Sequence, residues 1–261
     1  MDIIIPQWAI FVFIGMLGLM LGSFLNSWMW RTQMGIRGGR SMCVSCQKKL
    51  HWYENVPLAS YVALHGKCLV CKAQIPFDYF LVELITPILF IWLSIYHLRF
   101  PVFNSGHMLR DVIFVILLII IFVYDAKYQM ILSGVVWAGA AIGLAFNFFV
   151  LQYSFFSLLI GVVVGGGFFL LQYLISKGRW VGGGDVRLGT MMGLWLGWPN
   201  VLAALFVAYV VGAISAIPLL VFKKKEMRSE IPFGTFLAVG TVVAMFWGNF
   251  LINWYGGLVG W

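Results

Sequence analysis

Charged residues are scarce in this chain. Lysine, arginine, aspartate and glutamate make up only 10% of its 261 residues, and only nine residues are acidic. A soluble domain of ordinary composition carries about 25% charged residues, so this scarcity excludes that class. Hydrophobic residues make up 62% of the chain, and apolar runs of roughly 20 residues, the length that a helix needs to cross a bilayer, recur along it. The alternating segments of about ten residues that would build a membrane β-barrel are absent.

The apolar runs predict an all-α membrane protein, a bundle of about eight transmembrane helices. The first run has no basic region before it and is too long for a cleaved signal peptide, so we expect it to remain as a membrane helix. The sixth run is short, and we expect its helix to be tilted, half-buried or not fully spanning. The predicted spans are residues 7–30, 79–98, 109–125, 131–151, 155–176, 185–197, 200–222 and 233–255.

Basic residues predict the orientation of this bundle. With eight spans, 15 of the 17 lysines and arginines fall on one side of the membrane, and only Arg99 and Arg110 fall on the other. Loops rich in lysine and arginine stay in the cytoplasm, so we expect both chain termini outside. This bias, helped by anionic membrane lipid, explains the net charge of +8 without any nucleic-acid partner.

Cysteine is also rare, and all four cysteines lie in the one long polar segment of the chain. They form two CxxC pairs with 21 residues between them. Two such pairs at this spacing predict a structural zinc site with four thiolate ligands, which would fold a segment too small for a core of its own. Two disulfides are the alternative, but disulfides rarely persist in the cytoplasm. The predicted ligands are Cys43, Cys46, Cys68 and Cys71.

The polar segment divides the chain into three predicted parts. Residues 1–30 form a first transmembrane helix, residues 31–78 a cytoplasmic zinc-binding domain, and residues 79–261 a transmembrane domain that we expect to be catalytic. Two histidines near the cysteine pairs, His51 and His65, could replace a cysteine as ligand, although four thiolates already complete a tetrahedral site.

Ionisable groups inside a bilayer are costly and indicate function by default. Asp111 follows Arg110 at an outer helix end, where we expect an interfacial charge that reaches toward water. Glu83 lies early in the second span. It is interpreted either as a structural hydrogen-bond partner or as a substrate contact, and the sequence does not separate the two.

Two further carboxylates form a different pattern. Asp125 closes the third span and Asp185 opens the sixth, so the predicted topology puts both at the cytoplasmic surface at similar depth. Like charges close together cannot both ionise, so one carboxyl stays protonated and the other charged. The charged one can take a proton from water, while the neutral one polarises a peptide carbonyl. We therefore predict that they are the catalytic pair of a membrane aspartic protease.

Three glycines, Gly182, Gly183 and Gly184, lead directly into Asp185. Glycine adopts positive φ without strain and lets another chain approach closely, and we expect both properties here. Irregular backbone at membrane depth is tolerated only where protein or a water-filled cavity covers it. The glycine run therefore predicts a water-accessible site around the two aspartates.

Six motifs, in this order along the chain, resemble those of the prepilin peptidase family, the GxGD-type membrane aspartic proteases. One difference is that Leu132 follows Ile131 after the first aspartate motif, where the family usually has proline. The motifs are GSFLNSWMWR from Gly22, WYENVPLASY between the two CxxC pairs, FLVELITP after them, YDAKYQMI around Asp125, GGGDVRLG around Asp185 and IPFGTFLAVG from Ile231.

The resemblance implies a substrate, a reaction and a location. The substrate would be a type IV prepilin or pseudopilin, whose short basic leader is cut off after a glycine on the cytoplasmic face of the bacterial inner membrane. Methylation of the new N-terminus by S-adenosylmethionine is also implied, although the chain has no Rossmann-type glycine fingerprint for this cofactor. A transporter or channel with paired membrane aspartates and a zinc-folded cytoplasmic cap is the alternative, but no internal repeat supports it.

Overall fold

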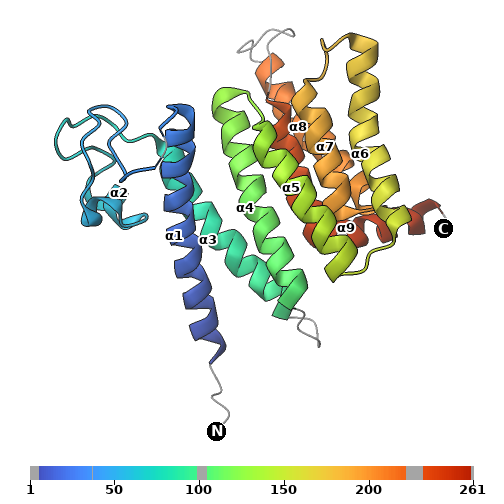
Figure 1. The fold of residues 1–261 in the computed structure, drawn as a ribbon, viewed down its shortest axis with the longest axis horizontal. Coiled ribbons are helices and arrows are strands. Elements are labelled where there is room, and N and C mark those ends of the chain that lie inside the picture. The colour runs from blue at the N-terminus through green and yellow to red at the C-terminus, as the bar shows by residue number, and fades with distance from the viewer. Residues whose placement is uncertain (1–5, 37, 99–104, 222–231, 260–261) are drawn as a thin grey trace. The chain divides into compact units, whose positions relative to one another are not determined.

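The computed structural model describes residues 6–36, 38–98, 105–221 and 232–259. The chain divides into two compact units, Met1–Asn104 and Ser105–Trp261, whose helices are drawn in Figure 1. Within the described residues no β-strand occurs, and only two isolated bridges, Met42 with Lys49 and Lys67 with Gln74, are present. The predicted all-α class is therefore confirmed.

The first unit consists of two long helices and the cysteine segment that joins them. Helices α1 (Gln7–Gln33) and α3 (Phe77–Leu98) pack side by side. Glycine allows this contact, because a Cβ at Gly18 would lie 2.5 Å from the Cα of Pro87. Between them come two short turns of helix, η1 (Trp52–Asn55) and α2 (Ala59–Ala63). The cysteine segment thus shares a unit with the first two long helices, and the predicted domain boundaries stay a prediction.

The second unit is a bundle of helices connected by short links. Seven helices in the described part of the protein, two of them in the first unit, are long and apolar enough to cross a membrane. Helix α7 has only 14 residues and is about 21 Å long, shorter than the ~30 Å core of a bilayer. The elements are α4 (Ser105–Tyr128), α5 (Ser133–Ala145) with the π-turn η2 (Phe146–Val150), α6 (Phe155–Ser176), α7 (Gly183–Leu196), α8 (Asn200–Val221) and α9 (Phe233–Val259).

The short helix α7 lies against α6 through facing glycines. A Cβ at Gly161 of α6 would lie 2.5 Å from the carbonyl oxygen of Gly193 of α7, and Gly165 faces Gly189 equally closely one turn away. Lipid tails are as apolar as leucine, so membrane helices associate through close packing of this kind rather than through a hydrophobic effect. The glycines therefore fix the position of α7 in the bundle, because they let the backbones of α6 and α7 touch directly.

The far end of α7 is held by a buried asparagine. Asn147, in the π-turn η2, is fully buried, and its side-chain amide donates to the carbonyl oxygens of Leu194 at 2.6 Å and Trp195 at 2.9 Å. The indole of Trp195 in turn donates to the carbonyl of Gly139 at 2.8 Å. The last carbonyls of a helix have no partner within the helix, so these bonds allow α7 to end inside the protein.

The orientation predicted from basic residues stays a prediction, since no membrane accompanies the helices. The basic run from Lys223 to Arg228, together with Arg37 and Arg99, lies outside the described residues.

Adding a methyl group at Gly165 should loosen the contact between α6 and α7. We expect Gly165→Ala to lower the free energy of unfolding by about 1–3 kcal/mol, the usual cost of overpacking. Gly167 of the same helix is the matched control, because the nearest atom to a Cβ there is 3.9 Å away. Gly167→Ala should leave the melting temperature in detergent unchanged or slightly raised. Equal melting temperatures for the two variants would contradict the packing role.

Candidate active site and metal centre

The first predicted aspartate is held by the start of another helix. Asp125 lies near the end of α4 and is buried, with 5% of its surface exposed. Its Oδ2 accepts a hydrogen bond from the backbone N–H of Thr235 at 2.8 Å, and the amide of Gly234 also interacts with the carboxylate. Both residues lie in the first turn of α9, whose free N–H groups and positive dipole end stabilise a carboxylate.

Only glycine fits between Asp125 and α9. A Cβ at Gly234 would lie 2.8 Å from Oδ2 of Asp125 and 3.0 Å from Cδ1 of Ile131. The absence of a side chain at Gly234 therefore lets the carboxylate reach the backbone of α9.

The second predicted aspartate caps the helix to which it belongs. Asp185 is the third residue of α7 and has 9% of its surface exposed. Its Oδ2 accepts from the backbone N–H of Gly182 at 3.1 Å, and its own N–H donates to the carbonyl of Gly182 at 3.1 Å. Each aspartate thus uses one oxygen to bind a backbone amide at a helix start.

The expectation of positive φ at the three glycines is wrong. Gly182, the N-cap residue, has φ −76° and ψ 153°, and neither Gly183 nor Gly184 adopts positive φ. Gly183 and Gly184 are the first residues of a regular helix, which requires negative φ. The expected close approach occurs at Gly184 alone, where a Cβ would lie 3.0 Å from the Cβ of Ile131.

The residue Ile131 connects the surroundings of the two aspartates. Its side chain lies against both Gly184, next to Asp185, and Gly234, next to Asp125. Helix α9 packs on both α4 and α7. The helix starts that hold the two carboxylates thus meet around one side chain. A pair that shares a single proton requires two carboxyl groups brought together in this way.

The sequence analysis did not identify Arg187 as a site residue. Arg187 connects the start of α5 to the glycine run. Arg187 donates through Nε to the carbonyl of Gly183 at 3.0 Å, and through Nη1 to the hydroxyl of Ser133. Ser133 is the first residue of α5, directly after the link that contains Ile131. Thr235 and Gly234 were also missed as site residues. The signals were present, because these residues lie in the GGGDVRLG and IPFGTFLAVG motifs.

Glu83 has a structural partner in the first unit. Its Oε2 accepts from the backbone N–H of Leu58 at 2.9 Å, and Ser23 and Asn26 also interact with the carboxylate. Leu58 precedes α2 and has φ 56°, a conformation that favours glycine. Glu83, a residue of α3, therefore binds the strained turn at Leu58 and keeps this turn close to α1 and α3. The alternative role, contact with a substrate, stays a prediction.

The expectation that Asp111 reaches toward water is wrong. Asp111 is buried, with 3% exposed, and its Oδ1 pairs with Nη2 of Arg110 at 2.6 Å. The guanidinium of Arg110 also donates to Oδ1 of Asn147 at 3.0 Å and to the hydroxyl of Tyr153 at 3.3 Å. A buried charge requires such partners, and here they also orient the asparagine that caps α7.

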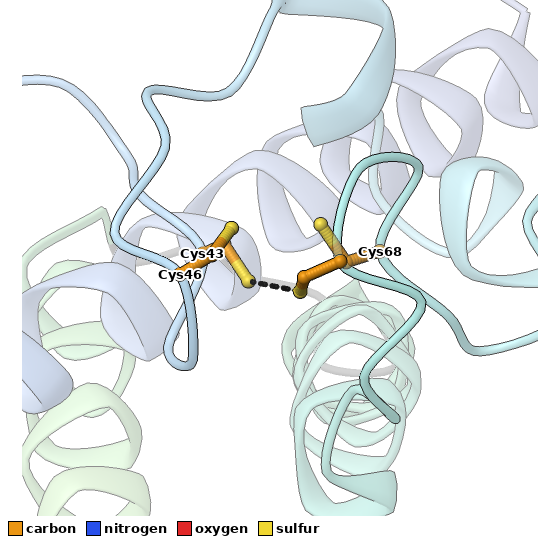
Figure 2. A group of neighbouring side chains, drawn as sticks. Cys43, Cys46 and Cys68 are labelled. Carbon is orange, nitrogen blue, oxygen red and sulfur yellow. Dashed lines mark hydrogen bonds between the residues drawn. The ribbon is translucent and has the colours of Figure 1, made fainter.

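The four cysteines come together as predicted. Figure 2 shows the pair of Cys43 and Cys46 facing Cys68 from the other knuckle. The four sulfur atoms all lie within 4.8 Å of one another, and Sγ of Cys43 is 3.8 Å from Sγ of Cys71. A tetrahedron of thiolates about 2.3 Å from zinc has edges of about 3.8 Å, so the cluster fits this metal.

The two cysteine pairs have the same backbone conformation. In each knuckle the residue after the second cysteine, Gln47 or Lys72, has positive φ and donates its N–H to the carbonyl of the first cysteine. The backbone N–H groups of Cys71 and Val70 lower the pKa of the Cys68 thiol to about 7. Metal ligation requires thiolates, and this amide pattern favours one.

The alternative ligands and pairings find no support among the described residues. All four cysteines are free rather than disulfide-bonded. The cluster contains only cysteines, and the ring of His51 stacks instead on that of Tyr53 with centroids 5.3 Å apart.

The bundle thus holds two buried carboxylates, each bound by a backbone amide at a helix start. Comparison with known families identifies the group: residues 16–97 match the bacterial peptidase A24 N-terminal domain, and residues 112–217 match the type IV leader peptidase family. The chain belongs to the type IV leader peptidase family, and the resemblance stated from its motifs is confirmed.

Curated relatives that cover most of the chain support this assignment. A protein of Pseudomonas aeruginosa is 33% identical over 82% of this chain and 74% of its own length. One of Bacillus subtilis is 30% identical over 91% and 94%, and one of Legionella pneumophila is 28% identical over 96% of both chains. All three are named prepilin leader peptidase/N-methyltransferase. No solved structure matches the chain.

Removing one thiol should release the metal without disturbing the aspartates. We expect the purified protein to carry one zinc per chain, and Cys46→Ser to lower that content severalfold, because three thiolates hold zinc less tightly than four. Elemental analysis checks the zinc content, and limited proteolysis checks the loosening of residues 31–78. Ser45→Ala, in the same knuckle, is the control. Protein purified without chelators that contains no zinc would contradict this prediction.

Proposed function

We propose that this protein is an aspartic endopeptidase that removes the short basic leader of type IV prepilins or pseudopilins, with Asp125 and Asp185 as its catalytic pair. The observation that carries the proposal is the arrangement of the two carboxylates. Both are buried, each is held by a backbone amide at a helix start, and the side chain of Ile131 lies against the glycine beside each of them. The names of the relatives supply the substrate class.

In the proposed reaction, the pair holds one proton between two carboxyl groups. The ionised carboxyl takes a proton from water, which then attacks the carbonyl carbon of the scissile peptide bond. The protonated carboxyl donates to the carbonyl oxygen, which becomes a hydroxyl in the tetrahedral intermediate. When this intermediate collapses, the carboxyl that took a proton from water gives it to the leaving amine and the C–N bond breaks. The other carboxylate takes a proton from one hydroxyl of the intermediate, whose oxygen becomes the carbonyl of the new carboxyl group. The pair again holds a single proton, and no covalent enzyme intermediate forms.

The proposed setting is the cytoplasmic face of a bacterial inner membrane, with both termini outside. The basic residues of the sequence support this orientation. A prepilin would place its hydrophobic helix in the bilayer and its leader at the surface, where Asp125 and Asp185 end and begin their helices.

The four-thiol cluster is proposed as a structural zinc site. Four thiolates fill a tetrahedral zinc ion, which leaves no open position for a reacting water. The metal would supply folding energy to residues 31–78, whose short helices η1 and α2 offer little core. Methylation of the new N-terminus by S-adenosylmethionine is supported by the relatives' names alone, and no residue is assigned to it.

Asparagine in place of either aspartate should abolish leader cleavage. Asn keeps the size of Asp but can neither ionise nor supply an acidic proton, so Asp125→Asn and Asp185→Asn should each lower the rate by at least 10²–10⁴, roughly the contribution of one general acid or base. The double variant should be no worse than either single one, because the pair acts as a unit. Mass spectrometry of a co-purified prepilin measures leader loss.

A third aspartate provides the matched control for this test. Asp111→Asn leaves Arg110 without its buried partner, so it should lower the melting temperature, in keeping with the roughly 3–5 kcal/mol lost when such a pair is broken. Cleavage per folded molecule should persist, because the glycine contacts with α6 still hold α7 in place. Substantial cleavage by purified Asp125→Asn or Asp185→Asn would overturn the assignment of that residue.

A methyl group at Gly234 should impair the same reaction through geometry. Gly234→Ala would bring a Cβ within 2.8 Å of Oδ2 of Asp125 and push the carboxylate off the α9 amides. A displacement of about 1 Å in a catalytic group commonly lowers the rate about 10²-fold. Gly134→Ala is the control, because a Cβ there meets nothing within 4 Å. The cleavage rates of the two variants are compared in preparations with equal zinc content and melting temperature. Equal rates would refute the role of Gly234.

A further inference from the structure

We propose that a groove beside the end of α1 binds the headgroup of one anionic phospholipid. The groove has a volume of about 510 Å³ and lies between α1 and the first part of the cysteine segment. Specific ligand sites commonly have volumes of about 300–1,000 Å³. Neither catalytic aspartate and none of the four cysteines lines it, so the groove is separate from both sites described above.

One end of the groove is cationic. Arg31, Arg40 and His51 line it, and no acidic residue is present among the described residues of its wall. Arg31 is already oriented, because its Nε donates to the carbonyl of Ser27 at 3.1 Å and its Nη1 to the carbonyl of Gly39 at 2.6 Å. A guanidinium has five N–H donors, so donors remain for the oxygens of a phosphate.

The other end of the groove is apolar and follows α1 into the membrane. Met20, Phe24, Ser27 and Arg31 all line the groove, and their spacing of four, three and four residues places them on one face of the helix. Met20 is 64% exposed and Phe24 55% exposed. At 1.5 Å per residue they lie about 16 Å and 10 Å along the helix from Arg31, the depth of acyl chains below a headgroup.

An exposed tryptophan also lines the groove. Trp52 lines it and is 78% exposed. Exposed tryptophan is enriched where acyl chains meet headgroups, because its ring is apolar and its N–H is polar. The groove thus combines arginine, tryptophan and apolar side chains, which suit the parts of a lipid.

This combination of charge and apolar surface selects the occupant. A basic leader peptide is repelled by Arg31 and Arg40. Inorganic phosphate would contact only the cationic end and leave Met20 and Phe24 uncovered. An anionic phospholipid matches both ends at once, with its phosphate between the arginines and its acyl chains along α1.

The test is lipid binding by the whole purified protein in a neutral detergent. Native mass spectrometry should show one phosphatidylglycerol bound tightly and phosphatidylcholine bound weakly. The double change Arg31→Gln with Arg40→Gln should weaken phosphatidylglycerol binding about 25-fold, at roughly five-fold for each basic residue. The matched control, Lys49→Gln with Lys67→Gln, removes two exposed charges of the same segment that do not line the groove, and should change binding less than two-fold.

Each contrary result would overturn the proposal. Equal weakening by the lysine control would show diffuse attraction, and equal binding of phosphatidylcholine would show that the headgroup charge is not recognised. Displacement of the lipid by inorganic phosphate or by S-adenosylmethionine would assign the groove to a soluble ligand instead. If the arginine double variant loses its zinc or its thermal transition, Arg40→Gln alone, compared with Lys49→Gln, decides the question.

Discussion

The direct backbone contact between α6 and α7 is the constraint on which the site depends. Helix α7 is too short to cross a bilayer, so its position cannot be set by the lipid. It is set by glycines of α6 that face Gly189 and Gly193, and by Asn147, which satisfies its last carbonyls. A helix fixed in this way presents Asp185, in its first turn, at a defined depth and rotation.

The same reasoning explains why Asp125 needs α9. A carboxylate at the end of α4 faces the negative end of that helix's own dipole, which disfavours its charge. The N–H groups in the first turn of α9 supply the opposite field, and Thr235 donates directly to the carboxylate. Glycine at position 234 permits the approach. The IPFGTFLAVG motif thus serves the aspartate 110 residues before it.

Features that depend on local sequence could be predicted, and those that depend on long-range contacts could not. The lengths of apolar runs located the helices, including the short α7, and the spacing of cysteines located the four-thiol cluster. Ile131 contacts both Gly184 and Gly234, so three segments that are distant in the sequence meet there. No local sequence pattern predicts this contact. For the glycine run, the expected close approach occurs at Gly184, but the expected positive φ does not, because α7 begins within the run.

The two aspartates are held by backbone amides of Thr235 and Gly182 rather than by other side chains. Their geometry therefore depends on where helices start and how closely they approach, which glycine controls. In the unit that carries the cysteines, Glu83 and the thiol cluster restrain a segment with little core of its own. Loss of the proposed zinc would loosen that segment but would leave the helix starts that hold the carboxylates unchanged. The positions around the proposed catalytic pair that tolerate substitution least should accordingly be glycines, although glycine has no functional group of its own.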